Sequence, residues 1–382
     1  MKKKLGVVLV AAVAIISLVL VGCAPEVAPP APPEEEEAPP EEEEAPPAAP
    51  EEEVFKWVYL GEHPSGTEYD LWVKDTADRV KVASGGRLDI RVTAGGEIVP
   101  AYDIVEAVRD GVGDMCWGNM VMQMKLIGPA GYLLTPTGLP GGPHPLELTA
   151  WYYYGDGEEI VNEIIKDYGI SIGGVASPAE LFCHSNVKLE SAADFKGVKF
   201  RTMGLWAELL EEYGASVITL SGSEIYEAAQ RGVIDAFEYC PPAQNWPLGF
   251  HEITKYIGVP GIHSPSWFSY FIVNHDSWNE LPSDLQHILK DEIKAMTVDD
   301  MLGSWYRDGL TMKKYEEYGN ELVVLSDEFQ ESIARRSKEL CDKYAAEDPL
   351  FKEVYENQKA FFKIFRGVSQ VNQPRFCLFD YD

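Results

Sequence analysis

Polar side chains able to bind a small acid stand at the ends of predicted strands. Arg201 closes the short strand Lys199–Arg201, and a guanidinium there offers a planar fork that matches a carboxylate with two parallel hydrogen bonds. Trp117 and Asn119 stand at the carboxyl end of another predicted strand, the edge at which open α/β sheets bind ligands. Asn119 could bond a carbonyl or hydroxyl, and Trp117 could wall the site. The alternatives are a structural salt bridge for Arg201 and core packing for the other two.

The chain carries none of the local motifs that mark common hydrolases or nucleotide-binding enzymes. There is no GxSxG, no HExxH and no P-loop, and the seven histidines are scattered without a nucleophile beside them in sequence. Binding without chemistry is therefore the favoured function. An extracytoplasmic enzyme acting on a small acid remains an alternative, with Glu238 and His263 as acid and base, because catalytic groups meet in space.

The first residues have the pattern of a secretory leader. Lys2 to Lys4 precede an apolar run over 5–21, which ends in Leu-Val-Gly-Cys23, the pattern of a bacterial lipobox. We therefore expect a signal peptide over 1–22 and a lipid on Cys23, so that the lipid anchor alone reaches the membrane. The alternative is a transmembrane helix, for which the run is short. Both alternatives place the rest of the chain outside the cytoplasm.

Residues 23–53 follow the lipobox as a predicted disordered stalk. Over 24–53 the sequence contains 12 glutamates and is otherwise almost entirely proline and alanine. Such a segment cannot bury enough apolar surface to offset its ordering entropy. Proline and charge repulsion should keep it extended, as a spacer between the membrane and the folded part. The alternative is an acidic tail that binds cations.

The charge of the chain excludes some partners. The whole sequence has a formal charge of −30, and removing the leader's lysines and the stalk's glutamates leaves −21. A body this acidic argues against nucleic acid or an anionic membrane surface as partner. It does not argue against a small anionic ligand, because one buried arginine can outweigh a distant surface field.

The remaining cysteines indicate neither zinc nor a disulfide framework. No CxxC pair occurs among the six cysteines of the sequence. With Cys23 taken by the lipid, an odd number is left, so we expect buried free thiols and at most two disulfides.

The apolar periodicity predicts two α/β lobes. The opening reads βαβαβ, which implies a parallel sheet covered by helices. A second set of short strands and helices follows, and then a long helical tract from about 281 to 318 with few breakers. The predicted strands are 55–60, 88–92, 114–117, 170–176, 181–184, 199–201, 217–219, 235–238, 267–273 and 321–325, and the predicted helices are 68–83, 102–110, 145–168, 204–213, 222–231, 281–318, 326–347 and 349–369.

Several segments together resemble one family of binding proteins. Residues 86–98 (GRLDIRVTAGGEI) and 106–115 (EAVRDGVGDM) are similar to the opening of TRAP transporter solute-binding proteins of the DctP type. The second lobe matches more specifically, in 194–201 (DFKGVKFR) and 220–239 (LSGSEIYEAAQRGVIDAFEY). Residues 260–265 (PGIHSP) and 281–286 (LPSDLQ) continue the similarity, which spans about 55–320. The 2-oxo-acid-binding branch of the family is the most similar.

This resemblance implies the architecture and the partners. It implies a two-lobed fold like that of type II periplasmic binding proteins, in its TRAP variety, with a ligand cleft between the lobes and a long bracing helix. We expect the first lobe over 54–176, with part of 240–275 crossing back, the core of the second over 177–240, and the bracing and C-terminal helices over 276–382. It also implies TRAP membrane subunits as partners and a homodimer through the C-terminal helices. A lipoprotein that senses its ligand and feeds no transporter is the remaining alternative.

The resemblance also assigns the binding residues. Arg201 falls at the family's carboxylate-binding arginine. Glu238 and the backbone carbonyl of Tyr239 fall where the family can ligate a cation that bridges the ligand, and calcium or sodium would take such oxygens. The alternative is that Glu238 caps a helix or pairs with a local residue. His263 lies in a loop of the branch and could line the cleft as a neutral donor, or be satisfied structurally in its turn.

Two departures from the family pattern affect the expected ligand. The family's glutamine upstream of the second-lobe strand has no counterpart in 177–180, where Glu180 could replace it as an oxygen ligand. Met120, Met122 and Met124 stand where the family often has tyrosines, and methionines adapt to irregular apolar shapes. They favour a ligand more apolar than pyruvate within the class of 2-oxo acids and related monocarboxylates.

Overall fold

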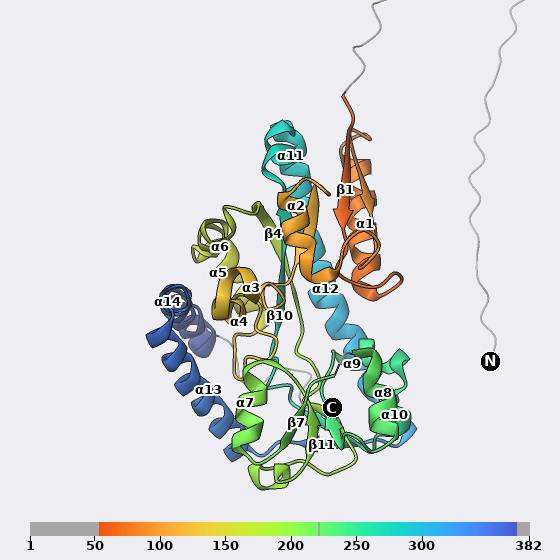
Figure 1. The fold of residues 1–382 in the computed structure, drawn as a ribbon, viewed down its shortest axis with the longest axis vertical. Coiled ribbons are helices and arrows are strands. Elements are labelled where there is room, and N and C mark those ends of the chain that lie inside the picture. The colour runs from red at the N-terminus through yellow and green to blue at the C-terminus, as the bar shows by residue number, and fades with distance from the viewer. Residues whose placement is uncertain (1–52, 221, 373–382) are drawn as a thin grey trace, which may run out of the picture. The chain divides into compact units, whose positions relative to one another are not determined.

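The structure is a computed structural model that describes residues 53–220 and 222–372. Two β-sheets organise this part of the chain, and we call each sheet with its covering helices a lobe (Figure 1). The first sheet has the strand order β2-β1-β3-β10-β4 and the second β11-β9-β5-β8-β6-β7. The predicted two-lobed α/β fold is confirmed.

The strands of the first sheet are β1 (Phe55–Leu60), β2 (Leu88–Val92), β3 (Met115–Gly118), β4 (Ile170–Ser177) and β10 (Trp267–Val273). Those of the second are β5 (Cys183–Ser185), β6 (Lys199–Arg201), β7 (Ser216–Ile218), β8 (Ala236–Phe237), β9 (Tyr256–Val259) and β11 (Glu321–Val324). The prediction missed β9.

The first sheet is mixed rather than purely parallel. β1 pairs in parallel with β2 and β3, as the βαβαβ opening predicts. β10 lies antiparallel to both β3 and β4, because it returns from the second lobe and enters the sheet from the opposite end. The expectation of a parallel sheet is therefore confirmed for β1, β2 and β3 and wrong for the pairs that β10 forms.

The helices are α1 (Glu68–Ala83), α2 (Ile104–Arg109), α3 (Met124–Ile127), α4 (Gly131–Leu134), α5 (Pro145–Tyr154), α6 (Gly157–Ile165), α7 (Gly204–Glu212), α8 (Gly222–Gln230), α9 (Pro242–Asn245), α10 (Phe250–Ile253), α11 (His275–Glu280), α12 (Ser283–Tyr318), α13 (Asp327–Glu347) and α14 (Pro349–Asn372). The predicted helix 145–168 is in fact two helices. Asp156 between them has a left-handed backbone, with φ of 63°, which ends the helical geometry after Gly155.

Local sequence signals explain the ends of α1. Thr67 precedes the helix, and its side chain accepts a hydrogen bond of 3.4 Å from the backbone N–H of Asp70. Acidic Glu68 and Asp70 occupy the first turn, where they complement the helix dipole. Gly85 and Gly86, both with positive φ, then turn the chain into β2.

The long helix α12 braces both sheets. It contacts β4 and α1 of the first lobe and α9 and β11 of the second (Figure 1). Its apolar residues Leu285, Leu289 and Ile293 pack into the core between the first sheet and α1. The C-terminal helices form a second brace, because α13 packs on α7 while α14 packs on α5.

The chain crosses between the lobes at the end of the first sheet where β3 and β4 finish, which is called its carboxyl edge below. β4 ends there at Ser177, and β10 begins there at Trp267, which pairs with Ser177. Residues 178–182 therefore lead into the second lobe and residues 260–266 lead back. The predicted residue boundaries of the lobes stay a prediction.

Candidate functional site

Arg201 stands at the end of β6 and is buried, with 4% of its surface exposed. Its neighbour in the sheet is β8, where Arg201 pairs with Phe237, the residue before Glu238. Nη1 donates to the backbone carbonyl of Glu238 at 3.0 Å and to its carboxylate Oε1 at 3.1 Å. Nε donates to the carbonyl of Leu220 at 3.1 Å. These bonds fix the plane of the guanidinium, so Arg201 is held in one orientation.

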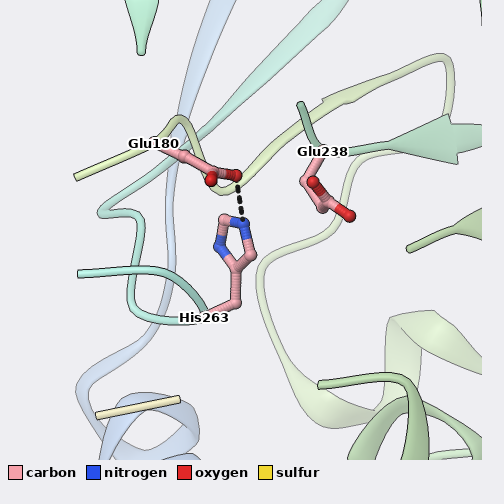
Figure 2. Close-up of side chains that lie close together, drawn as sticks. All are labelled: Glu180, Glu238 and His263. Carbon is pink, nitrogen blue, oxygen red and sulfur yellow. Dashed lines mark hydrogen bonds and ion pairs between the residues drawn. The ribbon is translucent and has the colours of Figure 1, made fainter. Parts of the chain in front are cut away.

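Glu180, Glu238 and His263 form a compact group of possible ligand atoms, all within 4.8 Å of one another. Each residue follows a different strand, β4, β8 and β9 respectively. The Nε2 atom of His263 lies 3.3 Å from Oε2 of Glu180, and Figure 2 shows these two side chains facing each other beside Glu238. The structure thus brings together Arg201, Glu180, Glu238 and His263, which were all predicted to belong to the binding site.

The two crossover segments position Glu180 and His263. The backbone N–H of Glu180 donates to the carbonyl of Ser264 at 3.2 Å, and the Ser264 hydroxyl donates to Glu180 Oε1 at 3.0 Å. Gly261 lies so close that a Cβ atom there would be 1.8 Å from the Glu180 carbonyl oxygen. Only glycine allows this approach, which places the two segments side by side.

Burial dominates the electrostatics of this group. It raises the pKa of Glu180 to about 7, although the hydrogen bond from Ser264 and the charge of Arg201 act in the opposite direction. It also raises the pKa of Glu238, again against the charge of Arg201. It lowers the pKa of His263 to about 4, so the imidazole is neutral at neutral pH. The carboxyl groups of the buried Glu238 and the largely buried Glu180 therefore share one arginine.

Tyr239 completes the second-lobe part of the site. Its ring lies 5.9 Å from the guanidinium carbon of Arg201, a cation–π distance. It also packs against Gly222, where an added Cβ would lie 2.5 Å from ring atoms of Tyr239. Burial raises the pKa of the half-buried Tyr239 hydroxyl to about 12, so the side chain is neutral. The backbone carbonyl, rather than the hydroxyl, is the atom predicted to ligate a cation.

Trp117 and Asn119 make their described contacts within the first lobe. Trp117 is a core residue that stacks on Trp267 and Phe271 at ring distances of 5.8 Å. Asn119 donates its backbone N–H to Glu62 at 3.2 Å, and its side-chain oxygen accepts from the N–H of Val121 at 3.1 Å. Both stand at the edge that leads to the second lobe, but their predicted contact with ligand stays a prediction.

The methionines near this edge do not share one environment. Met120 is buried in the first-lobe core with Ile104 and Leu134, so it is a packing residue. Met122 and Met124 are half-buried. Met120 therefore gives no support to the expectation of a more apolar ligand, which rests on Met122 and Met124 alone.

Sequence reasoning missed three polar residues at this edge, the buried Glu62 and Gln123 and the half-buried His63. Glu62 and His63 follow Leu60–Gly61 at the carboxyl end of β1. The rule that singled out Asn119 after β3 would have singled them out too. Gln123 has a weaker signal, since it lies in the turn before the short helix α3.

The described cysteines are free. Cys116, Cys183 and Cys341 are buried and Cys240 is partly exposed, as expected for free thiols. Cys23 and Cys377 lie outside the described residues, as do the predicted signal peptide and nearly all of the predicted stalk. Over 53–220 and 222–372, no helix has both the length and the apolar character of a membrane span.

The site is suited to binding an anion together with a cation. A fixed guanidinium can bond a carboxylate, while the oxygens of Glu180 and Glu238 and a ring nitrogen of His263 surround a point that a metal ion could occupy. An ion there would offset the negative charge of the two glutamates.

Comparison with known proteins also indicates a protein that binds a small solute. The family model for bacterial extracellular solute-binding proteins, family 7 (DctP), matches residues 61–348. The monocarboxylate 2-oxoacid-binding periplasmic protein of Nostoc sp. (strain PCC 7120) is 27% identical over 319 residues, which are 83% of this chain and 87% of that protein.

Solved structures of TRAP solute-binding proteins are similar to this chain in fold. A TRAP periplasmic solute-binding protein from Colwellia psychrerythraea with bound calcium and pyruvate has a TM-score of 0.76 and 27% identity, covering 84% of this chain and 98% of its own. One from Pseudoalteromonas atlantica with bound sodium and pyruvate has a TM-score of 0.74 and 26% identity, covering 84% and 97%.

These relatives are solute-binding proteins of transporters, not enzymes, so the alternative with Glu238 and His263 as catalytic acid and base is set aside. The family is extracytoplasmic, as the leader predicts for this chain. The chain belongs to the DctP family of bacterial extracellular solute-binding proteins, which serve TRAP transporters.

Proposed function

We propose that this chain is the lipid-anchored solute receptor of a TRAP transporter and that it binds a small monocarboxylate of the 2-oxo acid class. The observation that carries the proposal is the buried guanidinium of Arg201, whose orientation is fixed by hydrogen bonds to Glu238 and Leu220. Two further side chains that could bind an ion, those of Glu180 and His263, group with Glu238. The relatives that bind pyruvate and other 2-oxo acids support the same class of ligand.

In this proposal the ligand's carboxylate pairs with Arg201 and a sodium or calcium ion bridges it to the protein. Glu238, the carbonyl of Tyr239 and Glu180 are the proposed ligands of the ion, with His263 beside them as a neutral donor. Asn119 and Trp117 would contribute from the first lobe. Contacts from both lobes would favour a closed state by their differential affinity for it.

Attachment and assembly are part of the same proposal. The lipobox at Cys23 and the glutamate-rich segment after it support a lipid anchor with a spacer. The exposed apolar residues Ile364 and Val368 on α14 support a homodimer through the C-terminal helix, since exposed apolar surface of this kind favours association.

Replacing Arg201 tests the carboxylate site. We expect Arg201→Ala to lower the affinity for pyruvate by a factor of about 100 or more, because losing one partner of a buried charged pair costs roughly 2–5 kcal/mol. The measurement is titration calorimetry in a buffer with calcium, with a melting curve to verify folding.

The matched control is Arg231→Ala. Arg231 is 70% exposed and pairs with Glu227 on the surface, so its removal should leave the affinity unchanged. Normal pyruvate binding by folded Arg201→Ala would contradict the proposed carboxylate site.

A further inference from the structure

Unpartnered polar atoms gather at the carboxyl edge of the first sheet. Among the described residues, the buried atoms without a hydrogen-bond partner include Oε1 of Glu62, Nε2 of His63, Nε1 of Trp117 and of Trp267, and both amide atoms of Gln123. Buried polar groups are nearly always hydrogen-bonded, and an unpaired one costs free energy. A group of such atoms on and just after the neighbouring strands β1, β3 and β10 indicates a site built to receive a polar partner.

This edge leads to the proposed carboxylate site. β4 and β10 meet there at Ser177 and Trp267, and the segments beyond them carry Glu180 and His263. Tyr69 of α1 spans the two regions: its ring stacks on His63 at 4.5 Å, and its hydroxyl bonds with Ser177 and with Gln244 of α9. The unpartnered atoms therefore belong to the side of the first lobe that adjoins the second.

The backbone holds Glu62 firmly. A Cβ at Gly61 would lie 2.1 Å from the carbonyl oxygen of Thr93, and one at Gly95 would lie 2.3 Å from that of Glu62. The N–H of Gly95 also donates to the carbonyl of His63 at 2.7 Å. One carboxyl oxygen of Glu62 accepts the N–H of Asn119, which leaves Oε1 fixed and unpaired. A pre-organised group of this kind loses little entropy on binding.

Gln123 lies four residues after Asn119, whose backbone N–H bonds to Glu62. The turn after β3 is closed by hydrogen bonds from Met122 to Asn119 and from Gln123 to Met120. The Gln123 side chain is 1% exposed, and its carboxamide can donate and accept at once. Glu62 and Gln123 therefore offer both kinds of hydrogen bond.

This surface is uncharged at neutral pH. Burial raises the pKa of Glu62 to about 8, and only the Asn119 N–H opposes it, with no arginine or lysine among its described electrostatic neighbours. Burial lowers the pKa of His63 to about 4. A second carboxylate of a ligand would find no counter-charge there, whereas a hydroxyl or an amide would find matching partners.

We propose that Glu62 and Gln123 form a second, uncharged polar subsite that binds the end of the solute remote from its carboxylate. The preferred solute is then a monocarboxylate with a hydroxyl or carboxamide group on its tail, not pyruvate itself. This inference rests on the proposed function, because the remote end is defined relative to the carboxylate at Arg201.

Solutes of one shape and different tail polarity test the subsite. The set is 4-methyl-2-oxopentanoate, 4-hydroxy-2-oxopentanoate, 2-oxosuccinamate and 2-oxosuccinate, with pyruvate as the tail-less reference. We expect calorimetry to give at least one of the hydroxyl and amide solutes an affinity about tenfold or more above that of the methyl solute, since a buried site built for hydrogen bonds rejects an apolar isostere. The dianion 2-oxosuccinate should bind more weakly than its amide.

Variants of the subsite provide the second readout. In Glu62→Leu and in Gln123→Leu, the affinities for the polar-tailed solutes and for the methyl solute should differ by no more than about threefold. The reason is that an apolar side chain cannot form a hydrogen bond with a polar tail. Glu62→Gln, which stays uncharged and polar, should keep most of the ratio. The ratio cancels any general loss of affinity in a variant.

The outcomes separate this inference from the proposed function. Equal or tighter binding of the methyl solute by the wild-type protein would overturn the subsite, as would tightest binding of the dianion, even if the variants fail to fold. If no acid in the set binds, pyruvate included, the proposed function fails instead.

Discussion

Two acidic side chains, Glu180 and Glu238, stand beside the one guanidinium of Arg201. Glu180 and Glu238 both face this one arginine, and burial disfavours the charged form of each carboxyl group. A ligand carboxylate would add a further negative charge in the same small volume. A bound cation relieves this excess, which is the physical reason to expect ligand and cation to bind together.

Removing the cation should therefore weaken ligand binding. We expect protein treated with EDTA and dialysed into a sodium-free buffer to bind pyruvate about tenfold more weakly or worse, and calcium or sodium to restore the affinity. Glu238→Gln should abolish this cation dependence, because it removes the charged ligand. Calorimetry with and without each cation makes the measurement.

Glu190→Gln is the matched control for this variant. Glu190 is exposed and pairs with Lys188 at 3.3 Å, away from the site, so its loss should leave the cation dependence intact. Equal pyruvate affinity with and without cation in the wild-type protein would rule out the bridging ion.

At the scale of elements, the site depends on segments that strands and helices hold in place. The crossover segments 178–182 and 260–266 touch where Gly261 approaches Glu180. α12 secures the region from outside through polar side chains. The Asp300 carboxylate accepts from Ser177 at 3.3 Å, and that of Asp308 accepts from the N–H of Ala243 at 2.8 Å. One helix thus fixes the end of β4 and the start of α9.

A methyl group at Gly261 should separate the two crossover segments. The added Cβ would meet a backbone oxygen at 1.8 Å, which cannot move aside as a flexible side chain could. We expect Gly261→Ala to cost roughly 1–3 kcal/mol of stability, as overpacking does, and to weaken pyruvate binding at least tenfold by moving Glu180. Thermal unfolding and calorimetry measure the two effects.

Gly309→Ala provides the same substitution in a permissive place. Gly309 is exposed within α12, and an added Cβ there meets nothing within 4 Å. Replacing a helical glycine by alanine should stabilise the protein by about 0.5–1 kcal/mol and leave binding unchanged. If Gly261→Ala behaved like Gly309→Ala, the close approach would have no role in the site.

At the scale of the whole described chain, two braces join the lobes. α12 contacts strands of both sheets, while α13 and α14 pack on α7 and α5. The second half of α14 then presents apolar side chains without a described cover, with Ile364 at 75% and Val368 at 57% exposure. The proposed dimer contact therefore lies on a helix that carries none of the proposed binding residues.

The proposed homodimer should therefore dissociate without loss of binding. We expect sedimentation velocity to show a dimer, and Ile364→Glu combined with Val368→Glu to give a monomer with unchanged pyruvate affinity, because charges in an apolar contact are costly to bury. The control is Val82→Glu on α1, whose side chain is 81% exposed. A wild-type monomer at all concentrations would contradict the dimer.

The sequence by itself determined the local elements and the family. Apolar periodicity, caps and glycines predicted the strands 55–60, 88–92 and 199–201 with the bounds observed, because these signals act within a few residues. The motif around Arg201 and Glu238 identified the family, and with it a binding protein rather than an enzyme.

Only the tertiary structure decided which distant residues meet. Glu180 and His263 are 83 residues apart, and their contact depends on two crossings that no local pattern specifies. The antiparallel return of β10 has the same cause. The core position of Trp117 and the unpaired oxygen of Glu62 also depend on their three-dimensional neighbours, because burial and hydrogen-bond partners are set by the path of the whole chain.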